Sequence, residues 1–129
     1  MDEQQKQQQD MVVIFSYTRE QAIADGVLVD VSQTKEAREA GFKIPIVVTA
    51  GAHALIEVPE ALKGVQDYKG RLWDTLFLAA QAFLRSRGDK HLVPFKVIYQ
   101  TGEGRVEILD LWLCFNEHEG FTILLPEEY

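Results

Sequence analysis

The clearest pattern of hydrophobic and polar positions lies in GRLWDTLFLAAQAFLRSRG, residues 70–88. Apolar residues recur there at intervals of three and four, the period of one helical face. They are Leu72, Trp73, Leu76, Phe77, Ala80, Phe83 and Leu84. Asp74, Thr75, Gln81 and Arg85 fall largely on the other side, and Gly88 is placed to end the helix. The pattern predicts one dominant amphipathic helix whose apolar stripe packs on the core.

Three apolar runs make up the C-terminal third: FKVIYQ, VEILDLWLCF and FTILLP. The segments TGEGR and NEHEG separate them, and each contains glycine, as tight turns between antiparallel strands often do. We therefore expect a three-stranded antiparallel meander packed on the long helix.

In the middle run, the apolar positions change from even to odd residue numbers. Val106 and Ile108 share one parity, whereas Leu109, Leu111, Leu113 and Phe115 share the other. Such a change predicts either a bulge near Leu109 or a strand covered on both faces. The second face would carry Asp110, Trp112 and Cys114, with Ile98 and Leu124 beside them across the sheet.

The N-terminal half alternates short helical and short apolar segments. Thr18 and Gln21 have the spacing of a capping box, and Gly26 suits the left-handed end of a short helix. The strand VLVDVS follows, then the helix SQTKEAREAG closed by Gly41. KIPIVV is expected to be an edge strand or an extended entry, because Pro45 cannot donate to a ladder. Thr49 is placed to cap a helix in AGAHALIEV.

The pattern as a whole predicts an α+β protein. Residues 1–10, MDEQQKQQQD, are polar and glutamine-rich, and we expect them to form a disordered leader. Residues 11–129 are expected to form a single domain. Short helices and strands come first, one long helix follows, and the meander packs on that helix.

Composition narrows the class of protein. A single cysteine among 129 residues excludes an internal disulfide framework. No apolar run approaches the roughly 18 residues that span a bilayer, and the N-terminus lacks an apolar signal core, so we expect a cytoplasmic protein. The net charge is −7, and residues 101–129 hold seven acidic side chains against Arg105 alone. This balance argues against direct nucleic-acid binding and favours a basic protein partner.

The most chemically varied stretch is CFNEHEGF, residues 114–121. Cys114 and His118 are four residues apart, but in a strand followed by a turn they do not converge on a metal, so we expect a solvated turn. His53 and Glu57 have helical spacing without the second histidine of a zincin helix. Asp30, in VLVDVS, and Asp110 are expected to face solvent or accept hydrogen bonds. No catalytic residue, metal or cofactor is predicted.

A protein partner is expected to contact the second face and the acidic turns. Trp112 is the large aromatic anchor there, since aromatic side chains dominate binding hot spots. The predicted partner-binding residues are Glu107, Asp110, Trp112, Glu117, Glu119 and Leu124.

One resemblance adds context. YTREQAIADGVLVDVSQTKEAREAGFKIPIVVT, GRLWDTLFLA and FTILLPEE resemble a family of short uncharacterised proteins encoded on plasmids, integrative elements and phages. The likeness runs from about Val13 to Glu128, and ADGVLVDV and AREAGF are its most specific parts. It implies an accessory role in a mobile element, for example interference with host defence, and it transfers no catalytic residue.

The sequence thus favours a non-enzymatic, protein-binding accessory factor, with an acidic inhibitor of a nucleic-acid-binding defence system as one form. One alternative is a small-ligand or enzymatic domain with a pocket between the long helix and the sheet, using Asp30, Asp110, His53 or Cys114. Another is a homodimer that associates through Trp112 and Leu124.

Overall fold

The structure is a computed structural model that describes residues 18–58, 60, 63–64, 67–86, 91–102 and 104–129. In chain order the elements are α2 (Arg19–Ala24), β1 (Leu28–Asp30), α3 (Lys35–Ala40), β2 (Ile46–Thr49), α4 (Ala50–Ile56), α5 (Tyr68–Arg85), β3 (Leu92–Gly102), β4 (Arg105–Asn116), β5 (Gly120–Leu124) and the 3-10 helix η2 (Pro126–Glu128). The predicted α+β class is confirmed. The expected leader and Gly88 lie outside the described residues.

The sheet is larger than the predicted meander. Its five strands run in the order β1-β2-β5-β4-β3. All neighbours are antiparallel except β2 and β5, which pair in parallel. The N-terminal strands therefore join the C-terminal ones in one mixed sheet.

β2 is an interior strand, so the expectation of an edge strand in KIPIVV was wrong. Pro45 precedes the strand, and its carbonyl oxygen accepts a hydrogen bond from the amide of Phe121 at 2.8 Å. The missing proline N–H therefore falls outside the ladder. Gly120 allows this close approach, because a Cβ there would collide with the Pro45 carbonyl.

Local signals placed the N-terminal helices correctly. Thr18 caps α2 in a capping box with Gln21, and Thr49 caps α4 by accepting from the amide of Ala52. Gly41 ends α3 at φ 100°, a backbone conformation that favours glycine. These signals act within a few residues, so they hold whatever the tertiary surroundings.

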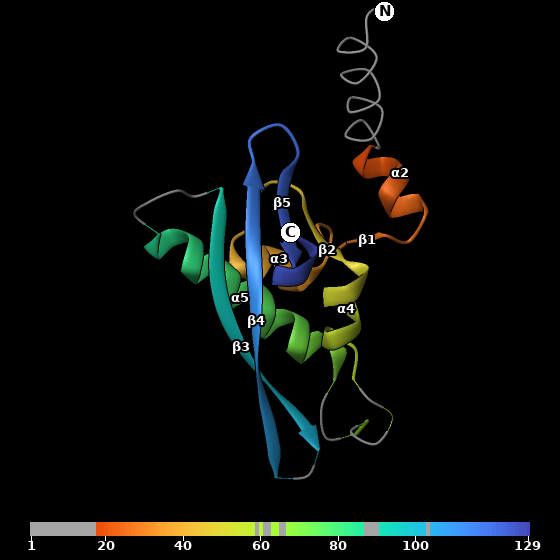
Figure 1. Ribbon diagram of the computed structural model, residues 1–129, viewed down its shortest axis with the longest axis vertical. Helices are drawn as coiled ribbons and strands as arrows, with labels where there is room; N and C mark the ends of the chain where they lie inside the picture. The colour runs from red at the N-terminus through yellow and green to blue at the C-terminus, as the bar shows by residue number, and fades with distance from the viewer. Residues whose placement is uncertain (1–17, 59, 61–62, 65–66, 87–90, 103) are drawn as a thin grey trace, which may run out of the picture.

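The core lies between one face of the sheet and the helices. α5 packs against β3 and α3, and in Figure 1 it passes behind β3 and β4. We call this the inner face. The fully buried side chains on it are Ile46, Val48, Val97, Leu111, Leu113 and Ile123. The aromatic rings of Phe42, Phe83, Phe115 and Phe121 contact one another in the same cluster.

The buried side of α5 differs from the predicted stripe. Leu84 is 72% exposed, whereas Thr75, expected on the polar side, is completely buried. Trp73 is only half-buried and stacks on Phe77 with ring centroids 4.9 Å apart. The buried residues of α5 are Arg71, Leu72, Thr75, Leu76, Ala79 and Ala80, so the buried side is rotated relative to the predicted stripe. It includes the polar side chains of Arg71 and Thr75, which find hydrogen-bond partners in the core.

No bulge occurs near Leu109. The pairing of β3 with β4 is continuous from Leu92 to Gln100, and its register shifts only between Gln100 and Gly102. Leu109 and the odd-numbered residues after it therefore face the core, while the even-numbered residues of β4 face the opposite side, which we call the outer face. The change of parity marks apolar residues on both faces of one regular strand.

Candidate functional site

The outer face of β3 and β4 carries the most exposed apolar surface among the described strands. Ile98 pairs with Ile108 across the two strands, and Val106 lies opposite Gln100 at the next position on that face. Ile98 and Ile108 are each 60% exposed and Val106 is 69% exposed. We call the paired strands β3 and β4 the β-ribbon, or simply the ribbon. Figure 1 shows no helix in front of this part of it. Clustered exposed apolar side chains of this kind commonly mark interaction surfaces.

One ion pair borders these three residues. Lys96 pairs with Asp110 across the strands, and its Nζ lies 2.6 Å from Asp110 Oδ1. Both side chains are exposed, so the pair contributes at most about 1 kcal/mol to stability. Asp110, predicted as a partner contact, therefore lies beside the exposed isoleucines with its charge already matched.

The outer face is covered over β2 and β5. Val47 of β2 and Leu124 of β5 are buried there. Arg19 of α2 reaches this face, donating to the carbonyl of Phe121 and to Thr122 Oγ1. Burial lowers the pKa of the Arg19 guanidinium, and the charges of Glu119 and Asp30 oppose that effect.

Two predicted partner residues belong to this covered part. The side chain of Leu124 is only 7% exposed. Trp112 is half-buried, with the Tyr129 ring 5.3 Å away in an edge contact. Sequence parity assigned both residues to the correct face, but it could not show that the C-terminal segment returns over them. In this structure the side chain of Leu124 is therefore not accessible to a second copy, and that of Trp112 is accessible only in part.

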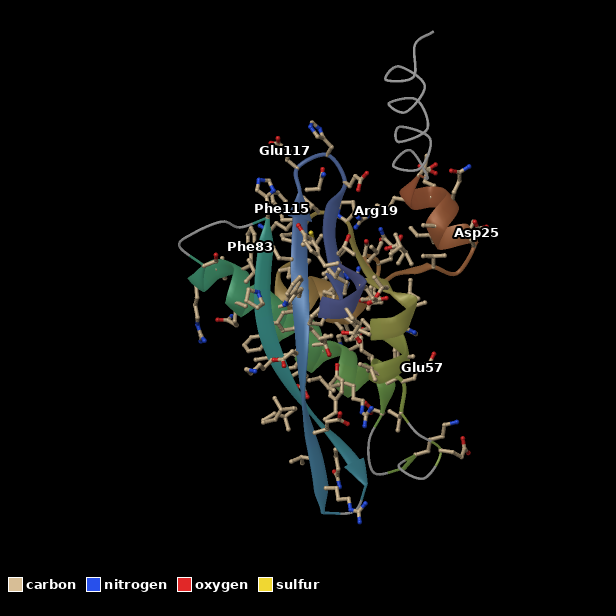
Figure 2. All side chains as sticks on the ribbon, viewed as in Figure 1. Arg19, Asp25, Glu57, Phe83, Phe115 and Glu117 are labelled. Carbon is tan, nitrogen blue, oxygen red and sulfur yellow. The ribbon has the colours of Figure 1, made fainter. Side chains whose placement is uncertain are left out.

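The predicted acidic contacts do not form one patch. Glu117 and Glu119 lie in the β4–β5 turn, whereas Glu107 lies near the β3–β4 turn, and Figure 1 shows these hairpins at opposite ends of the molecule. Figure 2 shows Glu117 at its hairpin tip. Glu107 pairs with Tyr99 and so is on the inner side of the ribbon, where it is exposed. Glu128 is engaged internally, accepting from Thr49 Oγ1 and the amide of Leu125.

CFNEHEGF forms a hairpin turn, as predicted. The side-chain oxygen of Asn116 accepts from the amides of His118 and Glu119, which fixes the turn between β4 and β5. Cys114 is half-buried on β4, while His118 is exposed in the turn. Across the described part of the chain, no three His, Cys, Asp or Glu side chains are placed to hold a metal.

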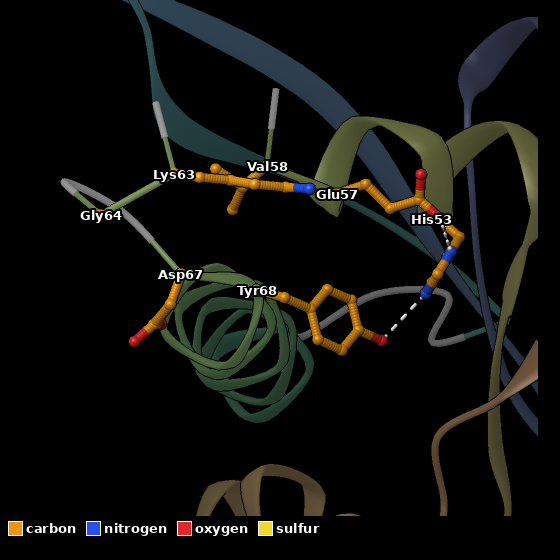
Figure 3. A pocket seen from close by; sticks show the side chains of 7 residues that line it. All are labelled: His53, Glu57, Val58, Lys63, Gly64, Asp67 and Tyr68. Atoms are coloured by element: carbon orange, nitrogen blue, oxygen red, sulfur yellow. Dashed lines mark hydrogen bonds and ion pairs between the residues drawn. The ribbon is translucent and has the colours of Figure 1, made fainter. Parts of the chain in front are cut away.

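His53 lies at a cavity of about 710 Å³ beside the N-terminal end of α5. Its Nε2 is 2.9 Å from the Tyr68 hydroxyl and its Nδ1 is 3.4 Å from Glu57 Oε1 (Figure 3). Val58, Lys63, Gly64 and Asp67 also line the cavity.

The Tyr68 hydroxyl of this cavity is not activated as a nucleophile. Burial, helped by the charges of Glu36 and Glu57, raises the pKa of Tyr68, so its hydroxyl stays protonated near neutral pH. It can donate or accept a hydrogen bond. Sequence reasoning identified the His53–Glu57 pair but missed Tyr68, because no local spacing connects α4 with α5.

The four residues proposed for an enzymatic pocket stay apart. Asp30 accepts from the amide of Ser32, Asp110 pairs with Lys96, and His53 lies at the cavity beside Tyr68. Pockets of about 560 and 300 Å³ lie between α5 and β3, and none of the four residues lines either of them. A catalytic arrangement built from them has no geometric support.

A buried polar network joins α5 to the ribbon, and the sequence did not suggest it. Arg71 donates to the carbonyls of Leu55, Glu57 and Gln100. The Thr75 hydroxyl donates to the Arg71 carbonyl, so its oxygen accepts from the hydroxyl of Tyr99. Burial raises the pKa of Tyr99. These bonds satisfy groups that would otherwise be buried without partners, so the network is structural.

No family model, curated protein or solved structure matches this chain. None of the described helices combines the length and apolar character needed to cross a bilayer.

Proposed function

We propose that this protein is a non-enzymatic, protein-binding accessory factor whose partner contacts the outer face of β3 and β4. The observation that carries the proposal is the exposure of Ile98, Val106 and Ile108 side by side on a regular strand pair. A regular, well-paired ribbon presents these side chains at little conformational cost, which favours association through them.

The wider role rests on the resemblance to proteins of plasmids, integrative elements and phages. In that setting the partner is a host protein, and the chain acts as an inhibitor of a nucleic-acid-binding defence system. The net charge of −7 supports a partner with a basic surface. Glu107 and Glu117 lie at opposite ends of the molecule, so they do not form one contact patch. In this proposal the net negative charge speeds the encounter with a basic partner, and the exposed apolar side chains of β3 and β4 make the contact.

The test is an affinity pull-down from host cell extract with three forms of the chain. They are the wild type, the double variant Ile98→Thr/Ile108→Thr, and the control Leu84→Gln. Threonine keeps the preference for strand while removing apolar contact area. Leu84 is a matched control because it is exposed on α5, away from the ribbon.

We expect one dominant partner that the wild type and Leu84→Gln retain and the double variant loses. Moderate salt should slow association without abolishing it. A partner retained equally by all three forms would place the contact elsewhere. The absence of any partner, with all three forms folded, would refute the proposal.

A small-ligand-binding function is the second candidate, because His53 and Tyr68 converge at a cavity of about 710 Å³. A thermal-shift screen of small polar aromatic compounds tests it, with Tyr68→Phe as the variant. Ligands that stabilise the wild type and fail to stabilise Tyr68→Phe would support this candidate. Equal shifts in both proteins would count against the cavity as the binding site.

A further inference from the structure

The core uses only part of the apolar stripe that the sequence predicts for α5. Within that stripe Leu72 and Leu76 are buried, whereas Trp73 is half-buried, Phe77 is 37% exposed and Leu84 is 72% exposed. The rings of Trp73 and Phe77 stack with an interplanar angle of 7°, so each ring restricts the orientation of the other. The exposed part of the stripe is therefore an ordered apolar surface that the core and the proposed function leave unused.

This surface lies on the side of α5 away from the sheet. The Thr75 hydroxyl accepts a hydrogen bond from Tyr99 of β3, so Thr75 marks the side of the helix that faces the sheet. Successive residues of an α-helix are turned by about 100° around its axis. Trp73 and Phe77 therefore lie about 160° from Thr75 around the helix, and Leu84 lies about 180° from it.

The spacing of the apolar residues on this side is that of a helix–helix contact. Trp73, Phe77, Ala80 and Leu84 follow one another at intervals of four, three and four residues. We call these four residues the α5 seam. Alternating intervals of three and four place side chains along one line, and two helices interlock where such lines meet. Ala80 is the small residue of the seam, so a large side chain of a facing helix fits against it.

The α5 seam is complementary to itself when a second copy lies antiparallel. In that arrangement Trp73 meets Leu84 of the second copy, and Phe77 meets its Ala80. Each contact then joins a larger side chain with a smaller one, which fills the space between the helices evenly. A parallel arrangement would instead place Trp73 against Trp73 and Phe77 against Phe77, and would leave Ala80 facing Ala80. The order of side-chain sizes therefore favours the antiparallel pair.

Two charged residues beside the seam favour the same arrangement. Asp74 and Arg85 are exposed, and neither takes part in an ion pair within the described part of the chain. They lie on one flank of α5, about 20° apart around the helix axis. A two-fold axis between antiparallel helices brings this flank of one copy to the same flank of the other. Asp74 of each copy therefore comes close to Arg85 of the other.

We propose that this protein forms a homodimer in which α5 packs antiparallel on α5 of a second copy through the α5 seam. Two ion pairs between Asp74 of one copy and Arg85 of the other border the contact. Stable complexes bury about 1,200 Å² or more, and one pair of helices buries less, so the dissociation constant is about 10–100 µM. The seam lies on the other side of the sheet from the outer face, so this inference goes beyond the proposed function and does not depend on it.

Sedimentation equilibrium of the full chain, at concentrations of about 5–500 µM, measures the dimer. Moderate salt is used to screen the repulsion between two chains of net charge −7. The variants are Leu84→Gln, Asp74→Arg and Arg85→Asp. The control Arg105→Asp makes the same change of charge as Arg85→Asp, at an exposed residue outside α5. Circular dichroism establishes that each variant is folded.

We expect the wild type and Arg105→Asp to dimerise equally. Leu84→Gln, Asp74→Arg and Arg85→Asp should each raise the dissociation constant about tenfold or more. An equimolar mixture of Asp74→Arg with Arg85→Asp should dimerise again, because every reversed charge then faces an opposite charge in the other chain. A second copy in the antiparallel arrangement explains this rescue, whereas a loss of folding in either variant does not.

Three results would overturn the proposal. They are a wild type that stays monomeric up to about 500 µM, a dimer that Leu84→Gln leaves unchanged, and a mixture that associates no more than its separate components. The double variant Ile98→Thr/Ile108→Thr should dimerise as the wild type does. Loss of the dimer in that variant would place the contact on the outer face and would also refute the proposal.

Discussion

The two faces of the β3–β4 ribbon are built from similar side chains but have different surroundings. Val97, Leu111 and Leu113 on the inner face are almost completely buried, whereas Ile98 and Ile108 on the outer face are 60% exposed. Both sets are aliphatic, and they alternate along the same two strands. The difference is that α5 covers only one side. Hydrophobicity along a strand therefore does not determine burial without a covering element.

Within the outer face, too, apolar residues are buried only where another element covers them. Val47 is buried on that face, and Arg19 of α2 makes its hydrogen bonds at the adjacent Thr122. Ile108, two strands away, has no such cover. Stability should therefore depend on the inner face and on the covered part of the outer face, and binding should depend on the exposed part.

Leu113→Ala should have the largest effect on stability. Leu113 is fully buried on the inner face, so truncation leaves a cavity and lowers the free energy of unfolding by about 2–5 kcal/mol. Urea denaturation at equilibrium measures the change. A loss below about 1 kcal/mol would mean that the core relaxes around the site, contrary to close packing of this face.

Arg71→Met should have the next largest effect. The variant keeps much of the side-chain volume but leaves the carbonyls of Leu55, Glu57 and Gln100 without this donor. The expected loss in free energy of unfolding is about 1–3 kcal/mol. Amide hydrogen exchange should also become faster in β3 near Gln100. Unchanged stability would show that water replaces the guanidinium at all three carbonyls.

Val97→Thr and Ile108→Thr sharpen the comparison of the two faces directly. At Val97 a hydroxyl enters the core without a prepared partner, which costs about 1–3 kcal/mol. At Ile108 the hydroxyl meets solvent, and the change should stay within about 0.5 kcal/mol. Thermal and urea unfolding of the two variants side by side measure the difference. Equal losses would mean that the outer face is covered in solution.

Asp74→Asn should have the smallest effect, and the effect should depend on pH. Burial raises the pKa of Asp74 in the folded protein, so its charged form disfavours folding. The contribution of Asp74 to wild-type stability should therefore decline as the pH rises from strongly acidic through the raised pKa. The asparagine variant lacks that decline, so it should be slightly more stable than wild type at neutral pH and should lose this advantage in acid. Tm measured across this range tests the sign.

Local features were predictable because their causes lie within a few residues. The Thr18 capping box, the Thr49 cap, the glycine that ends α3 and the turn at NEHEG all agree with the structure. For the candidate site, parity correctly grouped Asp110, Trp112 and Leu124 on one face and placed Ile98 beside them. Parity could not predict which of these residues is exposed. The ring of Tyr129 contacts Trp112, and no pattern of residue spacing predicts that contact.

The sequence by itself determined the α+β class, the positions of the caps and the two-sided apolar character of β4, because periodicity and backbone preference are local properties. Tertiary structure alone decided that β2 joins β5 in parallel, that Thr75 and Arg71 are buried, and that the acidic turns lie at opposite ends. Each of these depends on contacts between segments that are far apart in the sequence. Those contacts exist only when the sheet and its helices are assembled.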